Sequence, residues 1–377
     1  MRSFAQSTLT IGLAAALLVS CGGSQAPVGA PGLSSAQSAG RTATARHCLY
    51  VTDGGSHVVS ALAIDASSGA LRRLQSSPFK TGSRPVGEAI DPTGAFIYVA
   101  NSSSDDVSAF VIHTKSGRLT HVQGQPFAAG SFPWQVATDP TGKFTYVVNY
   151  NSNDVSAYAI NASSGALTLV QGSPFAAGSN PAGVAIDPTG AFAYVTNSGD
   201  NDISAYAINA SSGALTQVQG SPFAAGSAPR KVSIDGKFVY VANNSSNNVS
   251  AYAINTESGA LTQVQGSPFA AGSNPIGVAT DPTGSFVLVT NHGSHNVSAY
   301  AVNTSSGALT QVQGSPFAAG KLPTAVVIDS TGKFAYVANI GSNNVSAYAI
   351  DASTGALTQV QGSPFSAGRN PFDVAVR

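Results

Sequence analysis

From residue 47 onward the chain alternates short runs of Val, Tyr, Ile, Phe and Thr with clusters of Gly, Pro, Asn, Asp and Ser. Apolar residues at helical spacing are absent from this part of the chain. Short β-branched and aromatic runs that are bounded by turn residues predict β-strands joined by tight turns. One stretch contains four such runs in succession: Ala182–Asp187, Ala191–Asn197, Ile203–Asn209 and Ala214–Gln219.

This four-run pattern repeats along the chain. The Phe of the motif SPF or QPF recurs at positions 79, 127, 175, 223, 269, 317 and 365, so five of the six steps are 48 residues long. The one step of 46 residues has a visible cause, because Asp235-Gly236-Lys237-Phe238 lacks the two residues that separate Asp from Gly in the other copies, which are Pro-Thr in four copies and Ser330-Thr331 in one. A period of this size with four strands in each copy predicts the blades of a β-propeller.

The two ends of the repeat region complement each other. His47–Asp53 matches the second run of a repeat, and Asn370–Arg377 matches the first run and then stops. We therefore expect an all-β, seven-bladed β-propeller over residues 46–377, with four antiparallel strands in each blade. The C-terminal strand joins the N-terminal blade and closes the ring, which leaves no open sheet edge.

Charge excludes some partners. Only 9% of the residues are charged, and 17 basic residues balance 17 acidic ones. Binding to nucleic acid requires a basic stripe, and binding to an anionic membrane surface requires a polybasic segment, so we expect neither.

Cys48 aligns with Phe96 and Phe144 of other copies, which predicts a buried core residue rather than a reactive thiol.

The N-terminal residues have the pattern of a targeting segment. Residues 1–20 contain Arg2 and an apolar stretch from Leu9 to Val19 that is too short to span a bilayer, which predicts a signal peptide. The following LVSC resembles the lipobox of bacterial lipoproteins, which implies cleavage before Cys21 and lipidation of its thiol. Residues 21–45 are then a flexible tether, and the protein is a membrane-anchored extracytoplasmic lipoprotein facing the periplasm or the cell surface. The alternative is an ordinary cleaved signal peptide.

Part of each repeat resembles a known family. Tyr98–Asn101 reads YVAN, Tyr146–Asn149 reads YVVN and Tyr194–Asn197 reads YVTN, and DPTG and SGAL lie nearby. These segments look like the YVTN-type β-propeller repeat, and the resemblance covers residues 46–377. The wider group includes lactonase-like seven-bladed propellers, similar to the propeller-type 6-phosphogluconolactonase of bacteria, and extracellular binding proteins. The resemblance therefore implies either lactone hydrolysis or binding, since one fold carries many functions.

Differences between the copies predict where the protein meets a ligand. The turns after the first and third runs are nearly constant, whereas the loops on the other face vary and carry most of the unusual charged and aromatic residues. We expect a ligand-binding face there. The alternative is that these loops vary freely and their charges are only solvated. The candidate residues are Arg84, Glu88, Trp134, Gln135, Tyr150, Arg230, Lys231, His292, His295 and Asp373.

Three functions fit this interpretation, and the sequence favours the first. The first is a binding or scaffolding module for a protein or carbohydrate partner, with Trp134 stacking on a sugar. The second is a lactone hydrolase, with Glu88 or His292 as general acid or base and Arg230 stabilising the oxyanion. The third is a surface-layer or adhesion component. The pair His292 and His295 lacks a third ligand, so we expect no metal and no cofactor.

Overall fold

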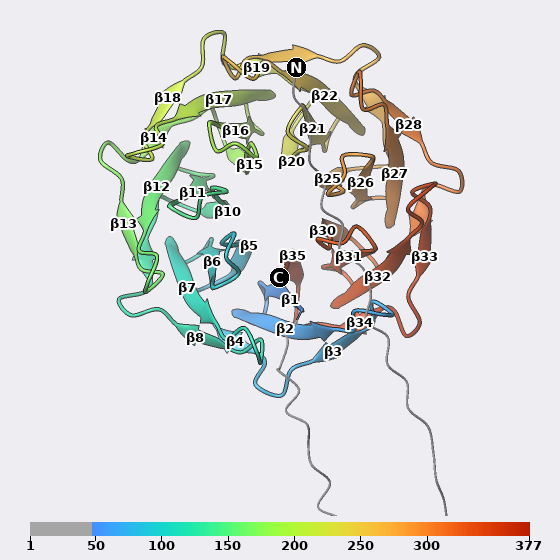
Figure 1. Cartoon of the computed structure of the whole chain (residues 1–377), viewed down its shortest axis with the longest axis horizontal. Coiled ribbons are helices and arrows are strands. Elements are labelled where there is room, and N and C mark those ends of the chain that lie inside the picture. Colours follow the sequence, from blue (N-terminus) through green and yellow to red (C-terminus); the bar gives the residue numbers. More distant parts are fainter. Residues whose placement is uncertain (1–46) are drawn as a thin grey trace, which may run out of the picture. The chain divides into compact units, whose positions relative to one another are not determined.

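The computed structural model describes residues 47–377. The predicted signal peptide (residues 1–20), the lipidation site Cys21 and the tether up to residue 45 lie outside the described residues. Seven antiparallel sheets follow one another around a ring, as Figure 1 shows, so the prediction of a seven-bladed β-propeller is confirmed. In the part that the structure describes, no helix has the length and apolar character needed to cross a bilayer.

Each blade is built outward from a six-residue inner strand that pairs with a six-residue second strand. The inner strands are β5 (Pro85–Ile90), β10 (Pro133–Thr138), β15 (Pro181–Ile186), β20 (Pro229–Ile234), β25 (Pro275–Thr280), β30 (Pro323–Ile328) and β35 (Pro371–Val376). The second strands are β1 (Cys48–Asp53), β6 (Phe96–Asn101), β11 (Phe144–Asn149), β16 (Phe192–Asn197), β21 (Phe238–Asn243), β26 (Phe286–Asn291) and β31 (Phe334–Asn339). We number the blades 1 to 7 in the order of these second strands.

The outer half of a blade has one strand more than the sequence predicted. The third strands are β2 (Val58–Ile64), β7 (Asp106–Ile112), β12 (Asp154–Ile160), β17 (Asp202–Ile208), β22 (Asn248–Ile254), β27 (Asn296–Val302) and β32 (Asn344–Ile350). The fourth strands are β3 (Leu71–Arg73), β8 (Leu119–His121), β13 (Leu167–Leu169), β18 (Leu215–Gln217), β23 (Leu261–Gln263), β28 (Leu309–Gln311) and β33 (Leu357–Gln359). The two-residue strands β4 (Phe79–Lys80), β9 (Phe127–Ala128), β14 (Phe175–Ala176), β19 (Phe223–Ala224), β24 (Phe269–Ala270), β29 (Phe317–Ala318) and β34 (Phe365–Ser366) pair with the start of the third strand.

The burial of each strand follows from its place in the blade. Every residue of the second strands is buried, because both faces of these strands pack on neighbouring blades. The fourth strands keep only their Leu buried and expose the next polar positions, as in β18 and β23. Seven clusters of buried apolar side chains result, and each spans two adjacent blades. Cys48 is fully buried in the cluster between blades 1 and 2, as predicted.

Tyrosines of the second strands bond one blade to the next. The hydroxyl of Tyr194 donates a hydrogen bond of 2.9 Å to the carbonyl of Gly259, which lies in the turn between the third and fourth strands of the next blade. Six blades make this bond, and blade 6 has Leu288 at the tyrosine position. Each bond satisfies two polar groups that packing has removed from water.

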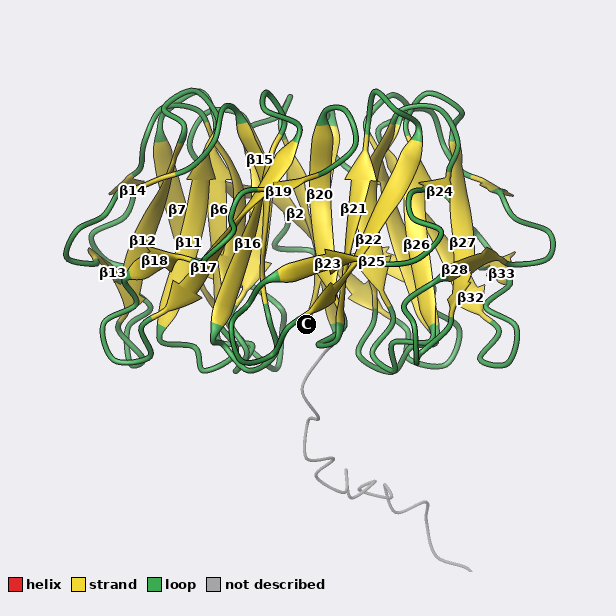
Figure 2. Ribbon diagram, turned by 90° about the horizontal axis from the view of Figure 1, so that it is seen from above, coloured by secondary structure: helices red, strands yellow, loops and turns green. Residues whose placement is uncertain are grey.

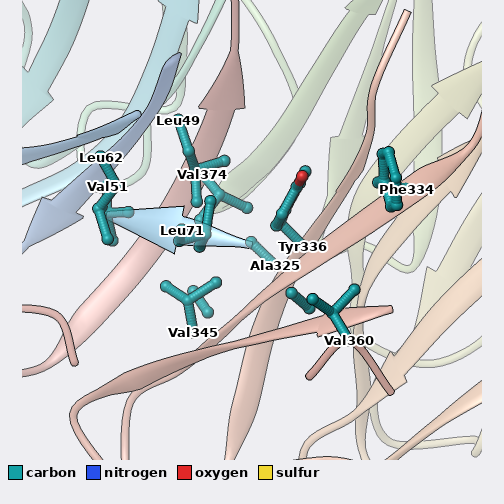
Figure 3. Packing of buried hydrophobic residues seen from close by; sticks show 12 residues of the cluster. Leu49, Val51, Leu62, Leu71, Ala325, Phe334, Tyr336, Val345, Val360 and Val374 are labelled. Carbon is teal, nitrogen blue, oxygen red and sulfur yellow. The ribbon is translucent and has the colours of Figure 1, made fainter. Parts of the chain in front are cut away.

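The ring closes as the ends of the repeat region predicted. β35 pairs with β1, so that Tyr50 lies opposite Ala375 and Val51 opposite Val374. Tyr336 of blade 7 donates a hydrogen bond of 3.1 Å to the carbonyl of Gly69 in blade 1. Figure 3 shows the shared core of these two blades, in which Val374 and Leu71 lie near Tyr336.

We expect inter-blade packing to make some turn glycines far less replaceable than others. Gly213 has a φ of +75°, and a Cβ added there would lie 2.3 Å from Cδ1 of Phe144 in the preceding blade. Gly124 also has a positive φ (+86°), but nothing lies within 4 Å of its added Cβ. Gly124→Ala should cost about 1–2 kcal/mol for its backbone conformation. Gly213→Ala should cost about 1–3 kcal/mol more because the site is overpacked.

Thermal and denaturant unfolding of the two variants, followed by circular dichroism, tests this expectation. Equal destabilisation by the two substitutions would show that the contact between Gly213 and Phe144 does not limit the packing of the blades.

Candidate functional site

Two groups of loops meet on one face of the ring. The loops between second and third strands bond to the segments that lead into the inner strands, for example through Ser102 N–H to Arg84 C=O at 2.9 Å. Figure 2 shows the strands running between two layers of loops, of which this is one. The variable loops that the sequence singled out therefore lie together.

One loop residue that the sequence put forward, His295, holds the loops in place, as equivalent residues of other blades do. Nδ1 of His295 accepts a hydrogen bond of 3.1 Å from the backbone N–H of Leu322. Oδ1 of Asn343 accepts the equivalent bond from Asn370 in the next repeat, at 2.8 Å. Both acceptor residues have a positive φ, as their counterparts in the other blades do. His295 therefore fixes the shape of a loop, a role that Asn fills elsewhere in the chain.

A bulge in every inner strand decides which side chains face the central channel. The register between inner and second strands shifts after the first proline, around the second and third positions of the inner strand. Bulges re-aim side chains in this way near functional sites. The third positions hold Gly87, Gln135, Gly183, Lys231, Gly277, Ala325 and Asp373.

The three large polar residues of this set meet inside the channel. Nζ of Lys231 in blade 5 forms an ion pair with Oδ1 of Asp373 in blade 1. Nε2 of Gln135 in blade 3 donates a hydrogen bond of 3.1 Å to the other carboxyl oxygen of Asp373. Asp373 is only 3% exposed. The channel is thus bridged by a network of side chains from three non-adjacent blades, and small residues of the other blades leave room for it.

Glu88 lies beside this network and does not reach the open mouth. The six other blades have Val at its position, and the inter-blade cores bury that valine, as with Val184 and Val232. Glu88 is 5% exposed, and neither carboxyl oxygen has a hydrogen-bond partner of normal geometry. Burial, and next the charge of Asp373, raise the pKa of Glu88 well above its ordinary value. A carboxyl group sealed in this way does not touch a ligand at the surface.

An aromatic cluster lies on the loop face, built from Phe132, Trp134 and Tyr150 of blade 3 and Phe372 of blade 1. The ring of Trp134 lies 5.6 Å from those of Phe132 and Tyr150, and it meets Phe372 edge-on at 5.1 Å. The guanidinium of Arg84 lies 5.4 Å from the Phe132 ring, within cation–π distance. Each of the four rings is partly exposed.

A cavity of about 350 Å³ adjoins this cluster and is lined by Arg84, His57, Ile340 and Phe372 among others. The candidate set predicted from the sequence contained Arg84, Trp134 and Tyr150 but neither Phe132 nor Phe372. Comparison of the repeats does mark Phe372, because it occupies the same strand position as Trp134 and Arg230.

His292 and Arg230 form a second group on the loop face. Nδ1 of His292 lies 3.3 Å from the carbonyl oxygen of Pro323. A carbonyl can only accept, so Nδ1 carries the proton and Nε2 keeps its lone pair. Burial lowers the pKa of His292, and the charges of His295 and Arg230 lower it further, while the bond to Pro323 opposes this shift. His292 is thus a neutral imidazole at neutral pH, and the guanidinium of Arg230 lies within electrostatic range.

This arrangement can support base catalysis and can stabilise negative charge. A neutral imidazole can take a proton from water, and a guanidinium within electrostatic range of it can stabilise an oxyanion. In the part of the chain that the structure describes, no three His, Cys, Asp or Glu side chains are placed to hold a metal ion.

We expect Glu88→Val to stabilise the fold and to change its pH dependence. The substitution gives blade 2 the valine of the other blades and removes an unsatisfied buried carboxyl, which is worth about 1–3 kcal/mol. Because the pKa of Glu88 is higher in the folded chain than in the unfolded chain, the folded state keeps a proton that the unfolded state releases. The stability of the wild type should therefore fall as the pH rises from 4.5, the ordinary pKa, through the raised folded value.

Denaturant unfolding of both proteins across this pH range measures the effect. Asp53, whose pKa burial raises to about 6, is present in both proteins, so the difference between the two profiles reports the Glu88 carboxyl together with its charge interaction with Asp53. Parallel pH profiles for the two proteins would contradict the raised pKa of Glu88.

Comparison with solved structures supports the architecture. A Bacteroides fragilis protein assigned as a 6-phosphogluconolactonase superposes with a TM-score of 0.78 at 22% identity, over 89% of this chain and 99% of that one. The periplasmic gluconolactonase of Pseudomonas aeruginosa superposes with a TM-score of 0.72 at 21% identity, over 88% and 98% of the two chains. At these identities the likeness concerns the fold.

Sequence comparison gives the family. No curated protein matches this chain. The family described as "Lactonase, 7-bladed beta-propeller" matches residues 41–180, 171–276 and 267–375, which together span the ring. The repeated blades, their closure into seven and this match agree, and the chain belongs to the lactonase family of seven-bladed β-propellers.

Proposed function

We propose that this protein hydrolyses a lactone at the loop face, with His292 as general base and Arg230 stabilising the oxyanion. The observation that carries the proposal is the bond from Nδ1 of His292 to the Pro323 carbonyl, which leaves Nε2 unprotonated, with the guanidinium of Arg230 within electrostatic range of the ring. Membership of the lactonase family and the similarity in fold to two proteins described as sugar lactonases support it. Neither observation names the substrate, so the proposal concerns the reaction class.

The reaction follows from these two side chains. Nε2 of His292 takes a proton from a water molecule, and the oxygen of that water attacks the lactone carbonyl carbon. The carbonyl oxygen becomes an oxyanion, and Arg230 stabilises its charge. When the ring C–O bond breaks, the imidazolium returns the proton to the departing ring oxygen. The product is a hydroxy acid, and His292 is neutral again.

Glu88 has no direct part in this proposal. It was the alternative acid or base predicted from the sequence, but it lies buried in the core between blades 1 and 2. Lys231 and Asp373 are engaged with each other. They and Gln135 form the floor beneath the mouth and hold blades 1, 3 and 5 in place.

We expect His292→Asn to reduce kcat/KM about 10²–10⁴-fold, the usual contribution of a general base. The chain itself shows that Asn fits this position, because Nδ2 of Asn244 donates the equivalent bond to Pro275 C=O at 3.3 Å. Arg230→Ala, which copies Ala182 of blade 4, should reduce kcat/KM about 10²–10³-fold because the contact with the oxyanion is lost.

The activity of the wild type should fall toward acidic pH as His292 takes up a proton. Because the pKa of His292 is lowered, this fall should lie below pH 6.5, the ordinary histidine pKa.

A panel of aldonolactones assayed on the purified protein measures these rates. His113→Asn is the matched control, since His113 is exposed in the turn after β7 and Asn161 holds the equivalent position in blade 3. Full activity of both His292→Asn and Arg230→Ala would refute the assignment of the active site to these two residues. Absence of hydrolysis by the wild type over the whole panel would refute the proposed lactonase activity.

A second candidate, binding without chemistry, is favoured by the aromatic cluster. Partly exposed aromatic rings beside a cavity suit the apolar face of a sugar, and Arg84 at the rim suits a carboxylate. This arrangement of aromatic rings, arginine and cavity fits a binding module with a carbohydrate or protein partner. Lipidation at Cys21 would hold such a module outside the cytoplasm at a membrane.

For this second candidate, we expect sugar acids to raise the thermal midpoint of the wild type but not of Trp134→Ala. The variant copies Ala182 of blade 4, so its own fold should be retained. A shift of equal size in both proteins would place the binding site elsewhere.

A further inference from the structure

Blades 1 and 2 carry arginines where later blades carry neutral residues. In β3 the residues after Leu71 are Arg72 and Arg73, whereas the equivalent pair in β18 is Thr216 and Gln217. Arg118, in the turn between β7 and β8, stands where blades 3 to 7 have Ala. Repeat packing does not require these three arginines, since the other blades fold without them.

The fold brings the three arginines into one groove. The turn between the third and fourth strands of blade 2 lies on blade 1, because Tyr50 donates a hydrogen bond of 3.0 Å to the carbonyl of Gly117. Arg118 thereby faces β3 across a groove of about 440 Å³, which is lined by Arg72, Arg73, Gln75, Ser76, Ser116 and Arg118 among others. The third strands run from the loop face to these turns, so the groove lies at the opposite end of the blades from His292.

Within the described residues, only the charge of Asp53 acts on one of these arginines, Arg73, and the two are linked through Ser60 without a salt bridge. All three arginines are exposed, none forms a salt bridge within residues 47–377, and no acidic side chain lines the groove. Nη2 of Arg73 makes one long hydrogen bond of 3.4 Å, to Oγ of Ser60. A guanidinium keeps its positive charge at any physiological pH. Three guanidinium groups around one groove therefore attract an anion.

We propose that this groove, which we call the arginine groove, binds a phosphate group. A phosphate offers up to two negative charges and three acceptor oxygens, and guanidinium forks match its geometry with paired hydrogen bonds. Ser76, Ser116 and Gln75 add neutral donors around it. The volume exceeds that of a phosphate, so the ligand is a phosphate ester whose attached group lies along the groove. Such an ester is either a soluble molecule or the headgroup of a phospholipid.

The test restores the repeat sequence at the groove. The variant Arg72→Thr, Arg73→Gln, Arg118→Ala gives blades 1 and 2 the residues of later blades, and Arg118→Ala alone is a milder second variant. The matched control, Lys143→Ala, Lys237→Ala, Lys333→Ala, loses the same charge from turns of other blades, where the equivalent positions hold Ala95 and Ala191.

The probes are inorganic phosphate, glycerol 3-phosphate and phosphatidylglycerol vesicles in phosphatidylcholine, measured by calorimetry and co-sedimentation at low salt. We expect the triple arginine variant to bind about 100-fold more weakly, the loss of several charge-assisted hydrogen bonds, and the lysine control to bind as the wild type does. Binding of the soluble probes identifies a soluble ester, and binding of vesicles alone identifies a headgroup. Failure of every probe, or equal losses in the arginine and lysine variants, would overturn the proposal.

Discussion

The pairing of β35 with β1 is the contact on which the rest of this molecule depends. A single blade leaves both faces apolar, and only neighbours on each side can cover them. The seven inter-blade cores therefore form a closed set, in which the cluster between blades 7 and 1 is the one made by the two ends of the chain. Tyr336 donates a hydrogen bond to the carbonyl of Gly69 across this closing interface, so it has the same tyrosine–glycine bond as five of the other interfaces.

Closure also sets the geometry of the channel. Seven inner strands converge, and the bulge in each aims its third residue inward. Four of these residues are Gly or Ala, which lets three large polar side chains meet without crowding. The ion pair between Lys231 and Asp373 joins blades that share no sheet. A buried pair of this kind adds little net stability, but it fixes which side chains occupy the channel and separates the buried floor from the open mouth.

Each candidate site arises where a blade departs from the repeat. In blade 6, His292 occupies the position that Asn244 holds in blade 5, and it makes the equivalent bond to a proline carbonyl. The local structure therefore accepts either residue, and the histidine adds a group that can act as a base. The aromatic cluster joins rings from blades 1 and 3, which are not adjacent. The arginine groove uses the seam between blades 1 and 2 at the other end of the strands. A nearly uniform scaffold thus leaves individual positions open to different chemistry, because packing does not depend on them.

The sequence by itself determined the number of blades, their strand order, the closure by the C-terminal strand and the face that holds the variable loops, since all of these follow from a periodic pattern of buried positions. It also identified Arg230, Trp134 and His292 as departures from the repeat. Only the tertiary structure decided what these departures do. It buried Glu88 in an inter-blade core, engaged His295 in a loop contact and paired Lys231 with Asp373 across the channel. It also brought Arg118 against β3, although the composition of the whole chain is neutral. The physical reason is that a repeat fixes the position of each residue within its own blade, whereas its surroundings come from other blades.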